Sequence, residues 1–468
     1  MKILSEILEN VSVIESHGNL ETGVSSVSLS SKTIEPNSLF VAIVGNVVDG
    51  HKFIDEVIEN GAKTIIYEKD IPEFKSGVTY IKVADTHSAV GVIASNFFGN
   101  PSRKLKLVGV TGTNGKTTTV TLLHQLFRKF GFKTGLISTV VDKINDDIVI
   151  TDRATPTTPD SIILNKLLAE MVDAGCEYCF MEVSSHAITE KRVLGINFIG
   201  GVFTNLTLDH LNYHGTFENY CDAKKGFFDM IPANGFAISN IDDERGEYML
   251  STTNAKKYTL SLKQKADFNE RFETKLLGEF NAYNILGVCA VAVLLGQDST
   301  KIKDLIKELE GAPGRFQAIK SPNGVTGIVD YAHTPDALEN VLKTASGMKG
   351  NGRVIAVVGC GGDRDKGKRP IMAKIGYDMS DILILTSDNP RSELPEDILA
   401  DMQKGLPLDG LDKVEIIIDR HIAIKKACEL AKAGDYVLLA GKGHETYQEV
   451  NGVKNHFDDM EELEKYLN

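Results

Sequence analysis

Residues 110–118 combine small residues, a lysine and hydroxyl groups in an order suited to binding a nucleotide phosphate. They read Val-Thr-Gly-Thr-Asn-Gly-Lys-Thr-Thr and follow an apolar stretch at 105–110. Small residues let backbone N–H groups face phosphates at a helix N-terminus. Lys116 is predicted to bridge the β- and γ-phosphates, and the Thr117 hydroxyl to bind Mg²⁺. Val110 stands where the full pattern has its first glycine, but strand, loop and helix follow in order, so ATP or GTP binding is expected rather than a plain turn with a solvated lysine.

The phosphate contacts are expected from one continuous run of residues. These are Gly112, Thr113, Asn114, Gly115, Lys116, Thr117 and Thr118.

Carboxylate and histidine groups follow two further predicted strands. Glu182 ends a strand at 178–183, Asp209 and His210 lie in the loop after a strand at 199–203, and Lys224 lies on the next helix. Oxygen and imidazole ligands of this kind suit a second Mg²⁺. Taken singly, each is better explained as an ordinary loop residue or helix-face charge. Together, at strand ends of one sheet, they favour a metal cluster.

The strands that position these residues alternate with helical stretches, the pattern of a parallel sheet with crossover helices. A small α/β unit comes first, with strands at 38–43 and 61–67 and a linker at 100–104. Strands of the second and third units are expected at 105–110, 134–140, 178–183, 199–203, 236–239, 353–358, 381–386, 414–418 and 436–440. The fold class is therefore α/β, with domains at 1–103, 104–319 and 320–468, and ligands are expected beyond the carboxyl ends of the strands.

Bulk composition excludes several classes of protein. A net charge of −13 argues against a general nucleic-acid binder. No run of about 18 apolar residues could span a bilayer, and the first residues do not form a secretory signal, so we expect a cytoplasmic protein without membrane insertion. Six cysteines make no disulfide framework, and the single C-x-x-C, Cys176 and Cys179, is attributed to core packing.

Motifs running in order along nearly the whole chain resemble those of the Mur ligase family. They are Thr111-Gly-Thr-Asn-Gly-Lys-Thr-Thr118, Met181-Glu-Val-Ser-Ser-His186, Leu208-Asp-His-Leu211, Ala223-Lys224, Gly314-Arg315, Val329-Asp-Tyr-Ala-His-Thr-Pro335, Gly359-Cys-Gly-Gly-Asp-Arg-Asp-Lys-Gly-Lys-Arg-Pro370, Asp388-Asn-Pro-Arg391 and Gly441-Lys-Gly-His-Glu445.

The resemblance implies a monomer with three domains: one for a uridine nucleotide, a central P-loop ATPase with a parallel sheet, and a C-terminal Rossmann-like domain that brings the amino acid. It implies an ATP-dependent amide ligase of peptidoglycan biosynthesis. Its substrates would be UDP-MurNAc-L-Ala-D-Glu and meso-diaminopimelate, joined through an acyl phosphate.

The resemblance also implies roles at the phosphoryl-transfer site. Thr117 and Glu182 would hold the first Mg²⁺, and His210 would help to hold the second. Lys224 would carry a carbamate formed with CO₂, which requires a lowered pKa, whereas Lys225 is taken as a solvated helix lysine. Nucleotide contacts are implied for Asn281 with the base, Arg315 with phosphate and Asp330 with the ribose.

Contacts to the nucleotide sugar are implied for Ser31, Thr157, Thr158, Ser185 and Arg192. Two departures stand near them. Ser30-Ser31-Lys32 replaces the Asp-Ser-Arg usual in the family, and Glu190 replaces a frequent Gln, which puts an acid beside an anionic peptide.

The resemblance also implies that the entering amino acid lies against Arg364, Asp388, Asn389, Pro390, Arg391, Gly441 and Glu445. Arg391 could grip the distal carboxylate of diaminopimelate with two charge-assisted hydrogen bonds, and Glu445 could hold the distal ammonium. Lysine would leave that guanidinium unpaired, a penalty of about 2–5 kcal/mol.

Several alternatives stay open at this stage. The amine could be L-lysine or meso-lanthionine, since lanthionine has the same two ends. A folylpolyglutamate-synthase-like ligase should lack the Asp-Asn-Pro-Arg loop and the Ser-Ser-His after Glu182. A nucleotide-binding regulatory protein without turnover should have lost the Mg²⁺ ligands or Lys224.

Overall fold

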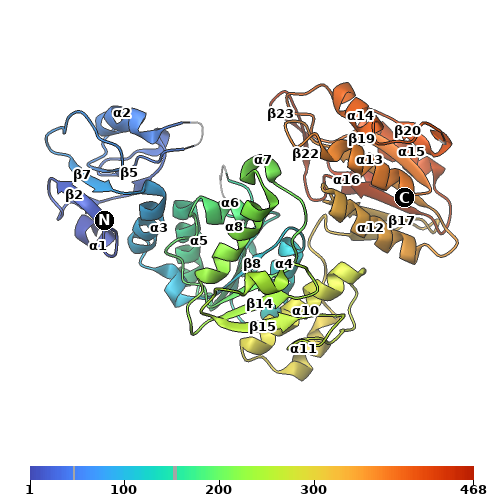
Figure 1. Ribbon diagram of the computed structural model, residues 1–468, viewed down its shortest axis with the longest axis horizontal. Coiled ribbons are helices and arrows are strands. Elements are labelled where there is room, and N and C mark those ends of the chain that lie inside the picture. The colour runs from blue at the N-terminus through green and yellow to red at the C-terminus, as the bar shows by residue number, and fades with distance from the viewer. Residues whose placement is uncertain (46–47, 151–154, 410, 468) are drawn as a thin grey trace.

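The computed structural model describes residues 1–45, 48–150, 155–409 and 411–467 and arranges them in three α/β domains, each built on its own sheet (Figure 1). This confirms the predicted fold class. The predicted limits at 103/104 and 319/320 fall inside η3 (Pro101–Lys104) and β16 (Gln317–Lys320) and stay a prediction. Within the described ranges, no helix is long and apolar enough to cross a membrane.

The N-terminal domain holds a five-stranded sheet of order β2-β7-β6-β5-β4. Its strands are β2 (Val13–His17), β4 (Val27–Ser28), β5 (Leu39–Val41), β6 (Thr64–Tyr67) and β7 (Thr79–Val83). Only β2 pairs antiparallel. One face packs on α1 (Leu4–Ile7) and α3 (Thr86–Phe97), the other on α2 (Ile54–Glu59). The strands expected at 38–43 and 61–67 correspond to β5 and β6, which are shorter than predicted.

The central domain is built on an eight-stranded sheet of order β11-β10-β9-β12-β8-β13-β14-β15. Its strands are β8 (Lys106–Thr111), β9 (Thr134–Ile137), β10 (Asp142–Ile144), β11 (Asp147–Val149), β12 (Tyr178–Glu182), β13 (Gly200–Phe203), β14 (Phe236–Asn240) and β15 (Lys256–Leu260). The six neighbouring strands β9, β12, β8, β13, β14 and β15 are parallel, as predicted. The strands β10 and β11 form an antiparallel hairpin at the β9 edge of the sheet.

Helices cover both faces of this sheet because successive side chains of a strand point to opposite sides. In β12, Tyr178 and Phe180 face one side, with α4 (Lys116–Lys129), α10 (Glu279–Leu294) and α11 (Ser299–Ile306). Cys179 and Met181 face the other, with α5 (Ser161–Asp173), α6 (Ser185–Thr189) and α8 (Phe217–Asp229). Two short helices, α7 (Leu211–His214) and α9 (Gly246–Met249), lie in the connections.

The C-terminal domain repeats this plan with a six-stranded sheet of order β16-β17-β21-β18-β19-β20, in which β16 is antiparallel. The other strands are β17 (Thr326–Asp330), β18 (Val354–Cys360), β19 (Ile382–Ser387), β20 (Val414–Ile416) and β21 (Tyr436–Ala440). One face carries α12 (Pro335–Met348), α13 (Lys368–Met379) and α14 (Pro395–Gln403), the other α15 (Arg420–Leu430) and α16 (Asp459–Leu467). A hairpin, β22 (Tyr447–Val450) and β23 (Val453–His456), follows β21.

Two local predictions have different outcomes. The linker expected at 100–104 is a 3-10 turn whose Pro101 and Ser102 are buried, and the Ser102 hydroxyl accepts a hydrogen bond from the Asn197 N–H at 3.0 Å. It is therefore packed structure rather than an exposed connection. Cys176 and Cys179 are both buried in the apolar core on one face of the central sheet, as the packing interpretation predicts.

Candidate active site

The loop between β8 and α4 turns at Gly115, which has φ +86°. A Cβ there would lie 2.5 Å from Asn284 Oδ1, so both conformation and space require glycine. The N–H groups of Thr113 and Asn114 donate to the Asn205 backbone and side-chain oxygens at 2.8 and 2.9 Å. Asn205, which the sequence did not single out, therefore braces the loop, and the N–H groups at the start of α4 are left as donors for an anion.

Two lysines converge on one oxygen of this loop. Lys116 Nζ donates to the carbonyls of Gly112 and Thr113, each at 2.8 Å. Lys224 Nζ, from the buried face of α8, donates to the same Gly112 carbonyl at 2.7 Å. Burial lowers the pKa of Lys224 well below its usual value, and the positive charge of Lys116 adds to the effect. Burial likewise lowers the pKa of Lys116. The structure thus favours a neutral amine at position 224.

Glu182 ends β12, beside the start of the phosphate loop, and its carboxylate is 1% exposed. It accepts hydrogen bonds from the Thr139 N–H at 2.8 Å and the Thr139 hydroxyl at 3.1 Å. Thr139 lies just beyond β9, the neighbouring strand on the other side. The carboxylate is therefore held in place at the carboxyl edge of the sheet, where the sequence predicted it.

His210 begins the short helix α7 with a left-handed backbone, φ +54°. Its Nε2 lies 3.3 Å from Asp209 Oδ2, and its ring centroid lies 4.8 Å from that of His186. The His210 ring also contacts the Tyr220 ring. Lys224 Nζ lies over the same Tyr220 ring, 4.6 Å from its centroid. His210 and Lys224 thus border the same aromatic side chain, which lies between them in the sequence.

Of the residues predicted for the nucleotide sugar, four gather near the end of β12. The Thr158 hydroxyl donates to the Glu182 carbonyl at 2.9 Å, and Thr157 Oγ1 accepts from Thr139 at 3.0 Å. Ser185 Oγ lies 2.9 Å from His214 Nε2. Arg192 donates to the Thr158 carbonyl at 3.1 Å.

The acid at position 190 is paired inside the protein. Its Oε2 accepts two hydrogen bonds from the Arg192 guanidinium, at 2.8 and 2.5 Å, and its Oε1 accepts one from Tyr213 at 3.0 Å. Burial and this carboxylate raise the pKa of Tyr213 to about 12. The charge of Glu190 is therefore offset by its neighbour instead of facing an anionic substrate uncompensated.

Ser31 lies apart from these residues, in the N-terminal domain on the left of Figure 1. It begins η1 (Ser31–Thr33), which the Ser30 hydroxyl caps by accepting from the Lys32 N–H at 3.3 Å. Ser30, Ser31 and Lys32 line an open hollow of about 420 Å³ together with Leu29 and Phe53. Ser31, predicted to contact the uridine end, therefore lines this hollow, and its role stays a prediction.

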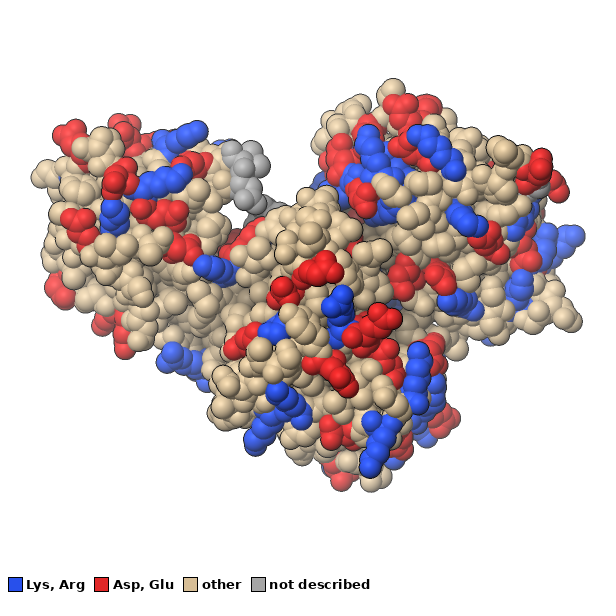
Figure 2. Space-filling view, in the orientation of Figure 1, with Lys and Arg blue, Asp and Glu red and all other residues tan. Residues whose placement is uncertain are grey.

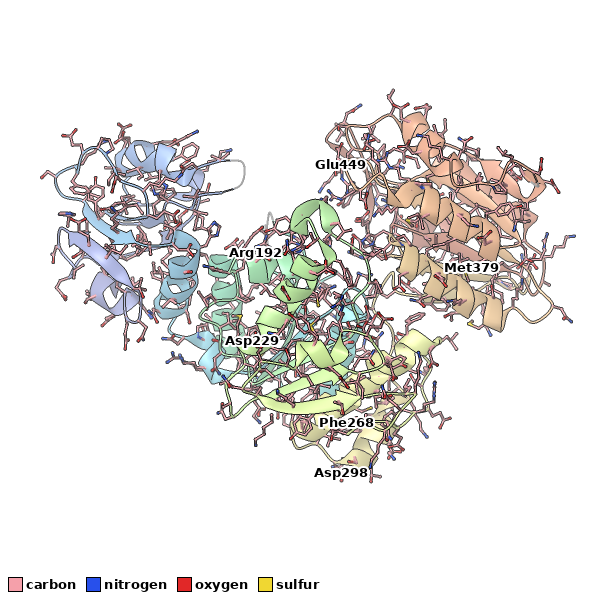
Figure 3. All side chains as sticks on the ribbon, in the orientation of Figure 1. Arg192, Asp229, Phe268, Asp298, Met379 and Glu449 are labelled. Atoms are coloured by element: carbon pink, nitrogen blue, oxygen red, sulfur yellow. The ribbon has the colours of Figure 1, made fainter. Side chains whose placement is uncertain are left out.

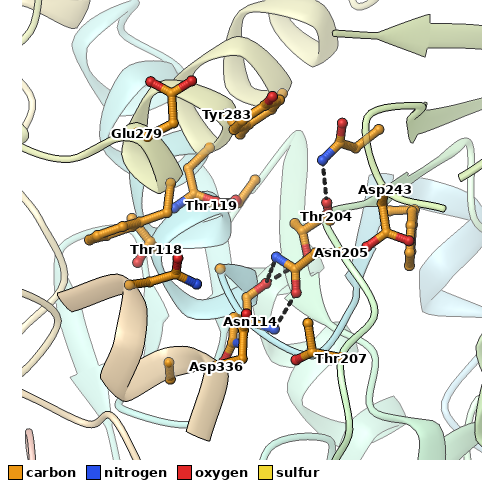
Figure 4. Close-up of a pocket in the computed structure, with 18 of the residues that line it drawn as sticks. Asn114, Thr118, Thr119, Thr204, Asn205, Thr207, Asp243, Glu279, Tyr283 and Asp336 are labelled. Carbon is orange, nitrogen blue, oxygen red and sulfur yellow. Dashed lines mark hydrogen bonds between the residues drawn. The ribbon is translucent and has the colours of Figure 1, made fainter. Parts of the chain in front are cut away.

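A cavity of about 350 Å³ lies beside the phosphate loop, between the central and C-terminal domains. Figure 4 shows Asn114 and Asp336 together at one side of it, where Asn114 Nδ2 donates to Asp336 Oδ2 at 3.0 Å. The predicted residues that line it are Asn114, Gly115, Thr118, Arg315 and Asp330.

Asn281, predicted to contact the base, lies behind the wall of this cavity. It is 3% exposed, and its Oδ1 accepts a hydrogen bond from Asn284 Nδ2 at 3.2 Å. Asn284 lines the cavity, with Tyr283 and Phe280. Spacing of three residues on one helix places both asparagines on the same face, which could have pointed to Asn284 from the sequence. The role of Asn281 stays a prediction.

Arg315 and Asp330 come from the segment that enters the C-terminal domain. Arg315 donates to the Thr117 hydroxyl at 3.3 Å, and its guanidinium carbon lies 4.5 Å from the Tyr331 ring centroid. Asp330 Oδ2 accepts from the Phe316 N–H at 2.7 Å, and burial raises the pKa of this carboxyl to about 6. Arg315 and, from α12, Asp336 thus already contact the phosphate loop.

The residues predicted to bind the amino acid form a second cluster, in the C-terminal domain. Asp388 and Asn389 follow β19, and Glu445 follows β21 two strands away in the sheet. Asn389 Nδ2 donates to Glu445 Oε2 at 2.7 Å. Gly441 has φ +119°, and a Cβ there would lie 2.9 Å from Asp388 Oδ2. Lys442, quoted within a motif but given no role from the sequence, lies fully buried among them.

Arg391 lies half-buried at the edge of this cluster. Its N–H donates to the Glu449 carbonyl at 3.0 Å, its Nη1 donates to the Gly362 carbonyl at 2.8 Å, and its Nε lies 3.8 Å from Glu449 Oε2. Arg364 lies on the neighbouring loop and donates to the Asp363 carbonyl at 3.3 Å. Pro390 precedes Arg391 and also supports this loop, since its carbonyl accepts from the Glu393 N–H.

The two clusters border a hollow. Figure 2 shows that the surface is hollowed between the N-terminal and C-terminal domains, and that Lys and Arg side chains gather on the C-terminal side. Figure 3 labels Arg192 on the central domain and Glu449 on the C-terminal domain, on the two sides of this hollow.

Comparisons with known proteins agree with this architecture. Family models match residues 23–98 (Mur ligase family, catalytic domain), 110–292 (Mur ligase middle domain) and 314–443 (Mur ligase, glutamate ligase domain). A Cytophaga hutchinsonii protein named UDP-N-acetylmuramoyl-L-alanyl-D-glutamate--2,6-diaminopimelate ligase is 51% identical over 475 residues, 97% of each chain. A Bacteroides fragilis protein of the same name is 51% identical over 480 residues, 99% of this chain and 98% of that one.

Solved structures extend the likeness to three dimensions. A structure of a UDP-N-acetylmuramoyl-L-alanyl-D-glutamate--2,6-diaminopimelate ligase superposes with a TM-score of 0.70 at 33% identity, covering 100% of this chain and 98% of that one. Matching models over most of the chain, relatives at half identity and a shared three-domain fold lead to one conclusion: the chain belongs to the Mur ligase family.

Proposed function

We propose that this protein is the ATP-dependent ligase that adds meso-diaminopimelate to UDP-MurNAc-L-Ala-D-Glu in peptidoglycan biosynthesis, releasing ADP and phosphate. Relatives named for this reaction match the chain at about half identity over nearly its full length. The observation that carries the proposal is the pair of clusters described above: a phosphate loop with a buried carboxylate and two lysines, and the loop residues of the C-terminal domain that include Arg391 and Glu445. These relatives leave the folylpolyglutamate and regulatory alternatives without support.

The reaction requires activation of the substrate carboxylate, because its direct displacement would expel oxide. The γ-phosphoryl group of ATP passes to a carboxylate oxygen, the bond to the β-phosphate bridge breaks, and ADP leaves. The neutral amine of the amino acid then attacks the carbonyl carbon, phosphate departs and the amine loses a proton. Lys116 and the free N–H groups at the start of α4 offset the negative charge on the phosphates during transfer.

The residues near Glu182 fit Mg²⁺. Among the described residues no group of three or more His, Cys, Asp and Glu side chains could hold a metal ion on its own. Mg²⁺, however, often takes one or two carboxylates together with substrate phosphates and water. The Thr117 hydroxyl and the Glu182 carboxylate would supply such oxygens to one ion, and His210 and modified Lys224 would serve a second. When bound, the ions would neutralise charge on the transferred phosphoryl group.

Carbamylation of Lys224 is supported by its surroundings. Reaction with CO₂ needs a neutral amine, and burial beside Lys116 favours that form. The carbamate converts a cation into an anion, which relieves the repulsion between two lysines that share the Gly112 carbonyl.

Substrate contacts follow from the same geometry. Ser31 would lie at the uridine end, while Thr157, Thr158, Ser185 and Arg192 would border the peptide end near Glu182. On the amino-acid side, Arg391 and Arg364 would bind the distal carboxylate and Glu445 the distal ammonium, with Asp388, Asn389, Pro390 and Gly441 shaping the pocket. ATP and the UDP-linked substrate are intracellular metabolites, so the enzyme would work in the cytoplasm. It would act as a monomer.

The proposal is tested by measuring ADP release with UDP-MurNAc-L-Ala-D-Glu and a panel of meso-diaminopimelate, L-lysine and meso-lanthionine. The expected result is release that depends on the dipeptide substrate and is fastest with meso-diaminopimelate, with a tripeptide product of matching mass. Faster turnover of lysine, or no ADP with any member of the panel, would contradict it. Comparable turnover of lanthionine would show that the enzyme recognises the carboxylate and ammonium groups at the two ends of the amino acid and not the atoms between them.

A further inference from the structure

A fully buried lysine lies among the residues predicted to bind the amino acid. Lys442 is 0% exposed and stands between Gly441 and Gly443 in the loop after β21. Its Nζ donates to Asn389 Oδ1 at 3.1 Å, to Glu445 Oε2 at 3.3 Å and to the Tyr447 carbonyl. An ammonium has three N–H donors, so these acceptors satisfy it completely. A ligand therefore cannot reach Lys442, and its effect must act through the groups that it holds.

Those groups are the ones predicted to contact the amino acid. Asn389 Oδ1 also accepts from the Glu449 N–H at 2.9 Å, and Asn389 Nδ2 donates to Glu445 Oε2 at 2.7 Å. Lys442 and Asn389 thus grip the same carboxylate oxygen of Glu445. Within the described part of the chain Glu445 Oε1 has no hydrogen-bond partner, which leaves it as the oxygen able to accept from a ligand. Lys442 therefore determines which way Glu445 points.

The charges around Glu445 leave room for one more cation. Lys442 Nζ also lies 3.8 Å from Asp388 Oδ1. Arg420, fully buried, forms two hydrogen bonds with Asp459 at 2.7 and 2.6 Å. The titratable and charged groups that interact with Glu445 from its own loop and the packed elements are Asp388, Lys442, Arg420 and Tyr331. In this buried group the three carboxylates of Glu445, Asp388 and Asp459 oppose the two cations Lys442 and Arg420, so one negative charge remains for a ligand ammonium.

Removal of Lys442 would change the ionisation of Glu445. Burial raises the pKa of Glu445, the charge of Asp388 raises it further, and Lys442 opposes both. Without the lysine, two neighbouring carboxylates in a desolvated pocket would bind a proton between them. A protonated Glu445 attracts an ammonium group far less.

We propose that Lys442 is a positioning residue that orients Glu445 and keeps it ionised, and thereby makes the pocket specific for an amino acid with a second ammonium group. The identity of that amino acid rests on the proposed function; the role of Lys442 in holding Glu445 adds to it.

The test compares Lys442→Met, which keeps the length of the side chain, with Lys454→Met as a matched control. Lys454 is exposed on β23, and its Nζ lies 4.4 Å from the Tyr447 ring centroid without touching Glu445. We expect Lys442→Met to raise the KM for meso-diaminopimelate by about tenfold or more, with kcat within about threefold of wild type. The KM values for ATP and UDP-MurNAc-L-Ala-D-Glu should stay unchanged, and Lys454→Met should match wild type throughout.

The pH profile separates charge from packing. The ratio of the two KM values, Lys442→Met over wild type, should grow as pH falls from about 8.5 to about 6.5, because Glu445 protonates only in the variant. Adding Glu445→Gln to Lys442→Met should abolish this growth. An unchanged KM for diaminopimelate, or an equal and pH-independent loss for all three substrates, would overturn the proposal.

A measurement without any change at position 442 covers the case in which Lys442→Met does not fold. The ratio of KM for Glu445→Gln over wild type should be constant across the same pH range if Lys442 keeps Glu445 ionised. A ratio that falls toward one at low pH would overturn the proposal. Failure of wild type to release ADP with any diamino acid would refute the proposed function instead, so the two failures are distinguishable.

Discussion

At the scale of single residues, the unusual feature is that two lysines donate to one carbonyl. Lys116 and Lys224 both contact Gly112 O, and Glu182 stands nearby on the adjacent strand. A cation beside a cation in a buried place is costly unless one of them is neutral or modified. The two side chains are therefore expected to differ in role.

Replacement of Lys116 or Glu182 by alanine should abolish ADP formation. Each change removes charge or a metal ligand at the phosphoryl transfer, where one such group contributes several kcal/mol, or about a hundredfold or more in rate. The measurement is steady-state ADP release, with thermal melting to verify folding. Lys129→Ala, which breaks only the surface pair with Glu308, serves as the control. Retention of more than about a tenth of the wild-type rate would refute the assigned roles.

Lys224→Ala should be nearly inactive and partly rescued by added short carboxylic acids, which can occupy the place of the carbamate. Lys225→Ala, one residue along and paired with Asp229 at the surface, should remain active. The activity assay is combined with mass or crystallographic analysis of the metal-loaded enzyme. An active enzyme with Lys224 unmodified would rule out the carbamate.

At the scale of elements, two loops at the carboxyl edge of the C-terminal sheet hold each other. The Arg391 backbone bridges to β22 at Val450, and the fully buried Arg369 on α13 donates to Glu393 at 2.8 and 3.1 Å and to Asp401 at 3.0 Å. These contacts fix the loop that carries Asp388 to Arg391. Its side chains can then read a ligand with little loss of conformational freedom on binding.

Arg391→Ala should lose far more activity with meso-diaminopimelate than with lysine. The change removes the bidentate grip on the distal carboxylate and the penalty that excludes lysine. The ratio of the two kcat/KM values should fall by at least about tenfold, equivalent to about 1.4 kcal/mol. Steady-state assays of both amino acids on wild type and variant provide the ratio. An equal loss for both would mean that Arg391 shapes the loop through Gly362 and Glu449.

Glu393→Gln should lower the Tm of the protein at neutral pH but not in acid. The hydrogen bond from Arg369, followed by that from Lys366, holds the pKa of Glu393 at about 2. A carboxyl whose pKa is lower in the folded state stabilises the fold above its unfolded pKa of about 4.3 and loses that effect as pH falls toward the folded value. The Tm difference from wild type, measured by calorimetry, should therefore shrink below about pH 4.3. A difference independent of pH would indicate loss of packing alone.

At the scale of the whole molecule, the proposed function places the amine and the carboxylate on different domains. The reacting atoms must approach to about 3 Å, whereas Arg192 and Glu449 border opposite sides of the hollow (Figures 2 and 3). Contacts between the domains already exist near the phosphate loop, where Asn114 donates to Asp336 and Arg315 to Thr117. These contacts lie beside the cavity of about 350 Å³ next to the phosphate loop. A ligand bound in that cavity would therefore influence the orientation of the C-terminal domain.

Binding of UDP-MurNAc-L-Ala-D-Glu, meso-diaminopimelate and a non-hydrolysable ATP analogue together should make the protein more compact. Small-angle X-ray scattering should show a smaller radius of gyration than that of the free protein, because bringing amine and acyl carbon together draws the domains inward. Each ligand alone should have a smaller effect. An unchanged radius with all three bound would indicate that the free arrangement already allows the reaction.

The sequence by itself determined most of the strands of the parallel sheets and where the motifs lie along them. The phosphate loop, Glu182 at a strand end, and the Asp388 to Arg391 loop were predictable because strand and helix periodicity and turn residues are local signals. Alternation within β12 likewise placed Cys179 in the core. Order in the chain was enough to assign these residues to the carboxyl edges of parallel sheets.

Only the tertiary structure decided how these residues pair. Glu190 is offset by Arg192 and Tyr213, Asn205 braces the phosphate loop, and Asn284 rather than Asn281 reaches the cavity. Lys442 is satisfied by acceptors from loops that follow different strands. Such pairings depend on side-chain direction and on contacts between distant segments, which no local pattern encodes. Burial, which lowers the pKa of Lys224 and raises that of Glu445, arises only when the sheets and helices close around them.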